Sequence, residues 1–88
     1  MGNPEYSETS KVKSPTIGRI VLFVPNDEVW PSELRNHADI LPAIVTRVWP
    51  NNVINIKVIN DGIKNVWYTS VNHSDEDLPG TWHWPLIK

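Results

Sequence analysis

The feature that most constrains the fold of this chain is its supply of β-branched residues, interrupted at short intervals by proline. Valine and isoleucine together number 19 of the 88 residues, whereas leucine and alanine together number 7, and eight prolines are spread along the chain. β-branched side chains lose rotamer freedom in a helix and pack well on a pleated surface, and proline interrupts helices and central strands alike. The composition therefore predicts an all-β protein built from short strands.

Five segments have the character of strands, and turn residues separate them. The segments are Thr16–Val24, Pro42–Trp49, Val53–Asn60, Val66–Val71 and Thr81–Trp84. Short apolar or alternating runs of this length, bounded by Pro, Asn, Asp and Gly, are typical of strands.

The connections suggest how these strands are arranged. Residues 27–41 form a long first connection, in which one helical turn over residues 32–35 is expected with Ser32 as its cap. Tight turns at Pro50-Asn51-Asn52 and Asp61-Gly62 follow, and an acidic loop over residues 72–80 precedes the last strand. This order predicts a small SH3-like antiparallel barrel of about five strands. An OB-like barrel is the alternative, although it usually has longer strands and a helix before the fourth.

The first fifteen residues differ in character from the rest. Residues 1–15 are polar and show no periodicity, which predicts a flexible N-terminal tail, with the barrel domain over residues 16–88. The other interpretation is an arm that orders against a partner, with Tyr6 as its anchor. A domain this small buries only about 60–65% of its unfolded surface, so its core is marginal.

Composition also limits the classes of function. The chain has no cysteine, a formal net charge of −2 and no apolar run near the length of a membrane helix. These features exclude disulfides and cysteine nucleophiles, and they argue against a broad contact with duplex nucleic acid. We expect a soluble intracellular protein that neither binds duplex nucleic acid nor enters a membrane.

The sequence carries no recognisable catalytic constellation. It has no nucleophile-elbow motif, no glycine-rich phosphate loop and no paired carboxylates at a strand end. His37, His73 and His83 lie in three separate segments, and such spacing is common by chance. We therefore expect a protein that is not an enzyme and that holds no metal and no cofactor.

Aromatic and hydroxyl side chains alternate in two segments, Trp67-Tyr68-Thr69-Ser70 and Thr81-Trp82-His83-Trp84. Strand alternation would place Trp67 with Thr69, Tyr68 with Ser70, and Trp82 with Trp84. An aromatic ring beside hydroxyls and an imidazole suits a nucleobase, which needs a stacking surface and edge hydrogen bonds. The plainer interpretation is that one or two of these tryptophans fill the barrel.

Two arginines lie within the expected strands. Arg19 and Arg47 carry charge where one face must meet solvent or a ligand, and a guanidinium there can hold a phosphate with two hydrogen bonds. The plainer interpretation is that both lie across the outer surface and pair with carboxylates.

A set of short motifs resembles a known family. The motifs, in chain order, are Gly18-Arg19-Ile20-Val21, Pro42-Ala43-Ile44-Val45 with Val48-Trp49, Asn55-Ile56-Lys57-Val58 before Asp61-Gly62, Thr69-Ser70-Val71, and Gly80-Thr81-Trp82-His83-Trp84-Pro85. Over about residues 17–86 the chain is similar to small phage and prophage proteins that end near a Gly-Thr-Trp-His-Trp-Pro box. The last motif is specific, whereas the others are weak alone.

The resemblance implies a function by analogy. Phages encode small β-rich oligomers that act as sponges, sequestering the cyclic nucleotides that activate host defence. The chain thus resembles a nucleotide sponge of the anti-CBASS type, which would bind a cyclic nucleotide without cleaving it in the cytoplasm of an infected bacterium. The expected ligand-binding residues are Arg19, Arg47, Tyr68, Thr69, Ser70, Trp82, His83 and Trp84.

Each of these residues has an expected role. Tyr68, Trp82 or Trp84 would stack on the base, while His83, Thr69 and Ser70 would make hydrogen bonds to its edge or to phosphate. Arg47 or Arg19 would neutralise phosphate. A homo-oligomer is expected, because the core is marginal and surplus apolar surface needs cover.

Two other classes of function stay open. An SH3-like barrel also suits a protein-interaction adaptor, in which Trp49, Trp67 and Tyr68 would form an aromatic groove for a host or virion peptide. The weakest interpretation is a structural part of the phage particle.

Overall fold

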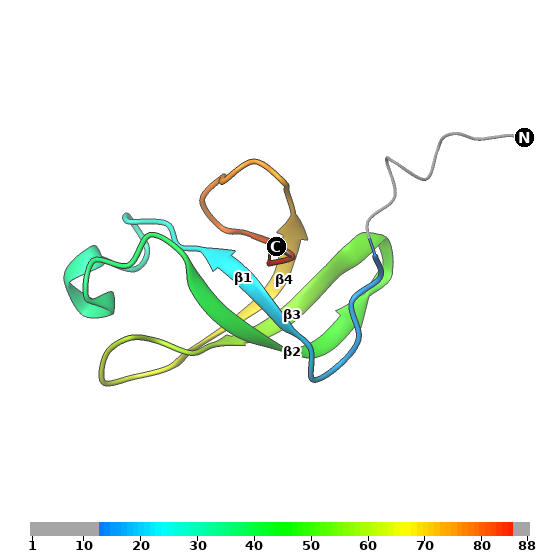
Figure 1. The fold of residues 1–88 in the computed structure, drawn as a ribbon, viewed down its shortest axis with the longest axis horizontal. Coiled ribbons are helices and arrows are strands. Elements are labelled where there is room, and N and C mark those ends of the chain that lie inside the picture. Colours follow the sequence, from blue (N-terminus) through cyan, green and yellow to red (C-terminus); the bar gives the residue numbers. More distant parts are fainter. Residues whose placement is uncertain (1–12, 86–88) are drawn as a thin grey trace, which may run out of the picture.

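The structure is a computed structural model that describes residues 13–85, and it is a closed barrel of five strands (Figure 1). The strands are β1 (Ile20–Val24), β2 (Leu41–Trp49), β3 (Val53–Val58), β4 (Val66–His73) and β5 (Thr81–His83), with 3-10 turns η1 (Ser32–Arg35) and η2 (Pro50–Asn52). Strands β1 to β4 pair antiparallel in sequence order, and β5 closes the barrel by pairing antiparallel with β1 and parallel with β4. The prediction of a small all-β, SH3-like barrel is confirmed. No described segment forms a helix that could span a bilayer.

The core follows from strand alternation. Inward residues of paired strands meet directly, as in the pairs Val21 with Ala43 and Phe23 with Leu41. The buried hydrophobic cluster consists of Val21, Phe23, Trp30, Leu41, Ala43, Val45, Ile54, Ile56, Val58, Val71 and Trp82. Nearly all of these side chains come from the strands, which is why the β-branched composition identifies the fold class.

The first strand is shorter than the sequence indicates. The Arg19 amide donates to the Thr16 carbonyl over 3.2 Å, and Gly18 adopts a φ of 93°, so the chain turns just before β1 instead of extending from Thr16. A φ in this region is easy only for glycine. The chain ahead of this turn lies against the barrel, since Pro15 is buried and the Trp84 Nε1–H donates to the Lys13 carbonyl over 3.0 Å.

The first connection contains the expected single helical turn, η1, but not the expected cap. Pro31 occupies the cap position without a side-chain hydrogen bond, and the Ser32 hydroxyl instead lies 3.2 Å from His37 Nδ1. Asn36 and His37 then adopt positive φ values of 52° and 61°, which end the turn. The expectation for residues 1–12 falls outside the described residues.

Two β-bulges flank the middle of β3. The β2–β3 register shifts between Val45 and Arg47, and the β3–β4 register shifts between Ile54 and Ile56. In each case the strand paired with β3, which is β2 or β4, has one extra residue opposite Asn55. The alternation expected along β4 is therefore wrong at this point: Ser70 has a φ of 58°, and its hydroxyl lies 3.2 Å from that of Thr69.

Candidate functional site

The outward-facing residues of β2, β3 and β4 form one continuous surface, which we call the outer face. Register pairs outward Arg47 with Asn55, and outward Lys57 with Trp67, in neighbouring strands. Arg47, Lys57 and Trp67 are exposed, whereas Ile56 and Val58, the chain neighbours of Lys57, are buried. Antiparallel pairing places such partners about 5 Å apart, so this surface presents its side chains as a compact array.

Asn55 organises the middle of the outer face. Its Oδ1 accepts hydrogen bonds from Trp49 Nε1, from the Thr69 hydroxyl and from the Ser70 amide, and each donor–acceptor distance is 2.9 Å. The bulge in β4 makes this convergence possible, because it sets both Thr69 and Ser70 opposite Asn55. Asn55 is only 8% exposed, so its side-chain amide is a buried group that holds these three neighbours in place at the surface through hydrogen bonds.

Arg47 and Trp49 form the cationic and aromatic part of this array. The Arg47 guanidinium carbon lies 4.2 Å from the centroid of the Trp49 ring, which is a cation–π contact. The indole is itself held by its bond to Asn55. Arg47, Thr69 and Ser70, three of the residues selected from the sequence, are thus brought together here.

Charge is unevenly distributed over the described part of the chain. Every aspartate and glutamate in residues 13–85 lies in a loop or in η1, and none lies in β2, β3 or β4. The outer face therefore carries Arg47 and Lys57 without a carboxylate beside them on these strands. A chain with a net charge of −2 thus presents a locally cationic surface with indoles on it.

The C-terminal motif is divided between the core and a second surface. Trp82 is fully buried, and its Nε1 donates to the Asn52 carbonyl over 2.9 Å, so no face of this indole is available to a ligand. Trp84 packs edge-on against Trp82 and is half-buried. The Arg19 guanidinium carbon lies 5.2 Å from the Trp84 ring centroid, beside a hollow of about 350 Å³.

His83 lies apart from both groups. Its Nε2 is 3.9 Å from an Asp77 carboxylate oxygen in the acidic loop, and its buried Nδ1 has no hydrogen-bond partner in the described chain. His73 Nε2 lies 3.3 Å from Asp75 in the same loop. These histidines are held against carboxylates and do not meet the outer face residues in any described contact.

Tyr68 points inward and away from the outer face. Its ring lies 4.7 Å from that of Phe23 and 6.3 Å from that of Trp30, measured between centroids. Burial raises the pKa of the Tyr68 hydroxyl above its ordinary value, and the nearby positive charge of Arg35 partly opposes this shift. Tyr68 lines a groove of about 840 Å³ between the first connection and the β3–β4 loop. Trp49, Trp67 and Tyr68 consequently do not line one common groove.

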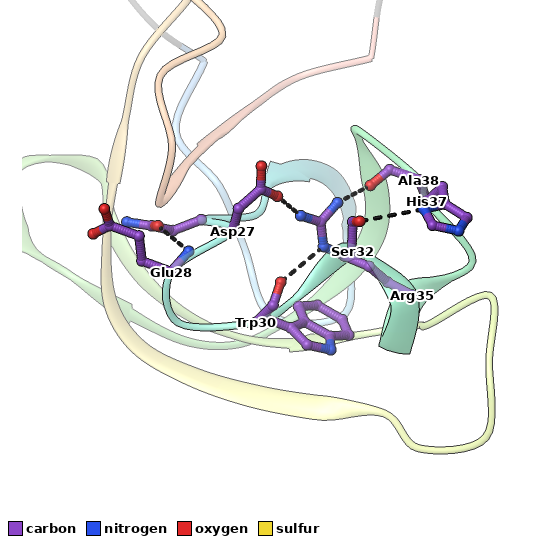
Figure 2. A network of polar contacts seen from close by, with 8 residues as sticks. Asp27, Glu28, Trp30, Ser32, Arg35, His37 and Ala38 are labelled. Carbon is purple, nitrogen blue, oxygen red and sulfur yellow. Dashed lines mark hydrogen bonds and ion pairs between the residues drawn. The ribbon is translucent and has the colours of Figure 1, made fainter.

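Arg35 fixes the shape of the first connection, and nothing in the sequence marked it out. The side chain is buried, its Nε donates to the Trp30 carbonyl over 3.1 Å, and its terminal nitrogens donate to the Ala38 carbonyl and to Asp27 (Figure 2). These bonds hold Trp30 against the core as one wall of the groove. Neither residue type nor spacing in the sequence predicts that an arginine will be buried and will make hydrogen bonds within its own loop.

Sequence reasoning also missed Asn55 and Lys57 as members of the outer face. The alternation of Val53–Val58 does indicate that both point outward. The bulges that gather the other side chains around Asn55 have no comparable sequence signal. Comparison of the chain with protein-family models, with curated proteins and with solved structures found no match.

Proposed function

We propose that this protein is a non-catalytic binding protein whose outer face takes an anionic aromatic ligand, namely a cyclic nucleotide. The observation that carries the proposal is the composition of the outer face, where exposed Arg47 and Lys57 lie among indoles and hydroxyls on strands that have no carboxylate. A nucleotide presents flat bases and negative phosphates, and this surface offers the complement of each.

The geometry supports separate roles for these side chains. Trp67 is 56% exposed and lies opposite Lys57 in the β3–β4 register, so a base stacked on the indole would place its phosphate near the ammonium group. Arg47, backed by the Trp49 ring, offers a second cation to a second phosphate. Thr69 and Ser70 add hydroxyls on β4, on the side of Asn55 away from Arg47. A ligand with two phosphates fits this arrangement better than a mononucleotide.

The proposed biological role is sequestration of a cyclic nucleotide defence signal during phage infection, as the family resemblance implies. Tight binding without cleavage needs stacking surfaces and phosphate-binding cations, and it needs no general acid, general base or nucleophile. Trp82 and Tyr68 take no part in this proposal, because one is buried in the core and the other lies in the groove.

The test is a thermal-shift panel of cyclic dinucleotides and cyclic trinucleotides, followed by calorimetry on any ligand that stabilises the protein. A ligand at a hundred times its dissociation constant adds about 2.7 kcal/mol, which raises the melting temperature of a domain of this size by about 10 °C or more. The ligand should be recovered intact by mass spectrometry after release. A panel without any shift would overturn the proposal.

Variants on the outer face then locate the site. Trp67→Ala should weaken binding by about 5- to 150-fold, the range expected for a lost base-stacking contact. Lys57→Ala should weaken binding and reduce its dependence on salt, since it removes one phosphate contact. Lys64→Ala is the matched control, because Lys64 is exposed in the β3–β4 loop and does not lie on the outer face. Equal affinity of all three variants would contradict this placement.

A further inference from the structure

A second surface of the molecule carries a protruding apolar side chain beside an apolar hollow. The first connection and the β3–β4 loop project from the same end of the barrel (Figure 1), and the groove of about 840 Å³ lies between them. Ile63, at the tip of the β3–β4 loop, is 99% exposed. Val29 and Leu34, on the opposite wall, are 68% and 63% exposed. Apolar exposure concentrated around one hollow is typical of an interaction surface.

The two walls of the groove are tied to each other, so the surface is preformed. The Asn60 side-chain amide donates to the Leu34 carbonyl over 2.9 Å, and the Asn36 amide donates to Asp61 over 2.9 Å. Gly62 permits this approach, because a Cβ there would lie only 2.7 Å from Asn60 Nδ2 and 3.0 Å from the Leu34 carbonyl oxygen. A preformed surface loses little conformational entropy when it associates.

The charges around the groove point to one kind of occupant. Glu33 lies on the wall formed by the first connection, whereas Lys64 lies on the wall formed by the β3–β4 loop, and both are exposed. The other charged residue that lines the groove, Asp61, shares the wall of Lys64, and its carboxylate already accepts from the Asn36 amide. This surface carries a negative side chain on one wall and a positive one on the other, and the protruding Ile63 lies beside the groove. Such a surface is complementary in charge and shape to a second copy of itself.

We propose that this groove is the interface of a homodimer in which each copy inserts Ile63 toward the groove of the other. A twofold axis along the groove sets the β3–β4 wall of one copy against the first-connection wall of the other. Ile63 then meets Leu34 of the second copy, and Lys64 meets Glu33, twice in each dimer. Such an isologous interface uses the same patch on both subunits. It leaves the outer face free, and it does not depend on what the outer face binds.

The test is sedimentation equilibrium of the full chain from micromolar to near-millimolar concentration. The wild-type protein should be a dimer at the upper end, and Ile63→Asp should weaken association by about tenfold or more, as expected for a well-packed interface side chain. Leu78→Asp is the matched control, because Leu78 is an exposed apolar residue in the acidic loop, away from the groove. Since Ile63 is exposed at a loop tip, its substitution should leave the melting temperature of the monomer unchanged.

Variants that reverse the charge of Glu33 or Lys64 test the proposed contact between these two residues in the same sedimentation experiment. Glu33→Lys and Lys64→Glu should each weaken the dimer, because each sets like charges against each other at two places in the interface. The double variant Glu33→Lys/Lys64→Glu should restore association, because it exchanges the two signs. A wild-type chain that stays monomeric at near-millimolar concentration, a dimer indifferent to Ile63→Asp, or a double variant as weak as the single variants would overturn the proposal.

Discussion

Asn55→Ala is the substitution that tests the architecture of the outer face most sharply. The Asn55 Oδ1 accepts three hydrogen bonds of 2.9 Å, and the residue is 8% exposed. A net contribution of about 1 kcal/mol for each bond, reduced because water can reach the exposed Ser70, gives a loss of about 2–3 kcal/mol. In a domain of this size that loss lowers the melting temperature by about 10–20 °C. The bulge in β4 should also lose definition, because no other side chain among the described residues accepts from the Ser70 amide.

Urea unfolding followed by tryptophan fluorescence measures this free energy. Asn72→Ala provides the matched control, since Asn72 is an exposed asparagine on the neighbouring strand β4 and should change stability by less than about 0.5 kcal/mol. The reasoning is refuted if Asn55→Ala loses no more than the control. In that event the bulges would be held by backbone pairing alone, and Trp49, Thr69 and Ser70 would not be fixed by a common partner.

Three further predictions follow from single residues. Trp82→Ala should cost about 3–5 kcal/mol and leave little folded protein at 37 °C, as judged by circular dichroism, because the largest fully buried side chain is removed. Ser70→Gly should stabilise the protein by up to about 1 kcal/mol in the same urea assay, because glycine adopts a φ of 58° without strain; a loss of stability would show that the hydroxyl contact matters more. Burial raises the pKa of Tyr68, so the folded state releases this proton at higher pH than the unfolded state does. Folding stability should consequently fall as pH rises past the ordinary tyrosine pKa, and Tyr68→Phe should remove that part of the fall, as measured by urea unfolding at several alkaline pH values.

The sequence predicts the fold well because the signals for it are local. The β-branched runs and the Pro and Asn residues between them are read directly from the chain, and the turn at Asn51 and Asn52 needs only the tolerance of asparagine for positive φ. The closing pairing of β5 with β1 is less local, but the order of one long connection, two tight turns and an acidic loop leaves few alternatives to a small barrel.

The site is predicted less well because it depends on register. A shift of one residue exchanges the two faces of a strand, and this decides that Trp82 fills the core. The same limit applies to β4, where the bulge sets Thr69 and Ser70 beside Asn55 while Tyr68 turns inward. The local alternation of apolar and polar residues predicts neither the bulge in β4 nor the buried contacts of Arg35.

The most direct test of the proposed function is an NMR titration of the protein with the nucleotide that stabilises it best in the thermal-shift panel. The indole N–H signals of the tryptophans distinguish the outer face, which carries Trp49 and Trp67, from the groove and the core. We predict that the signals of Trp49 and Trp67 on the outer face shift, while those of Trp30 beside the groove and Trp82 in the core do not. Perturbation centred on Trp30 and the groove, or no perturbation by any cyclic nucleotide, would contradict the proposal.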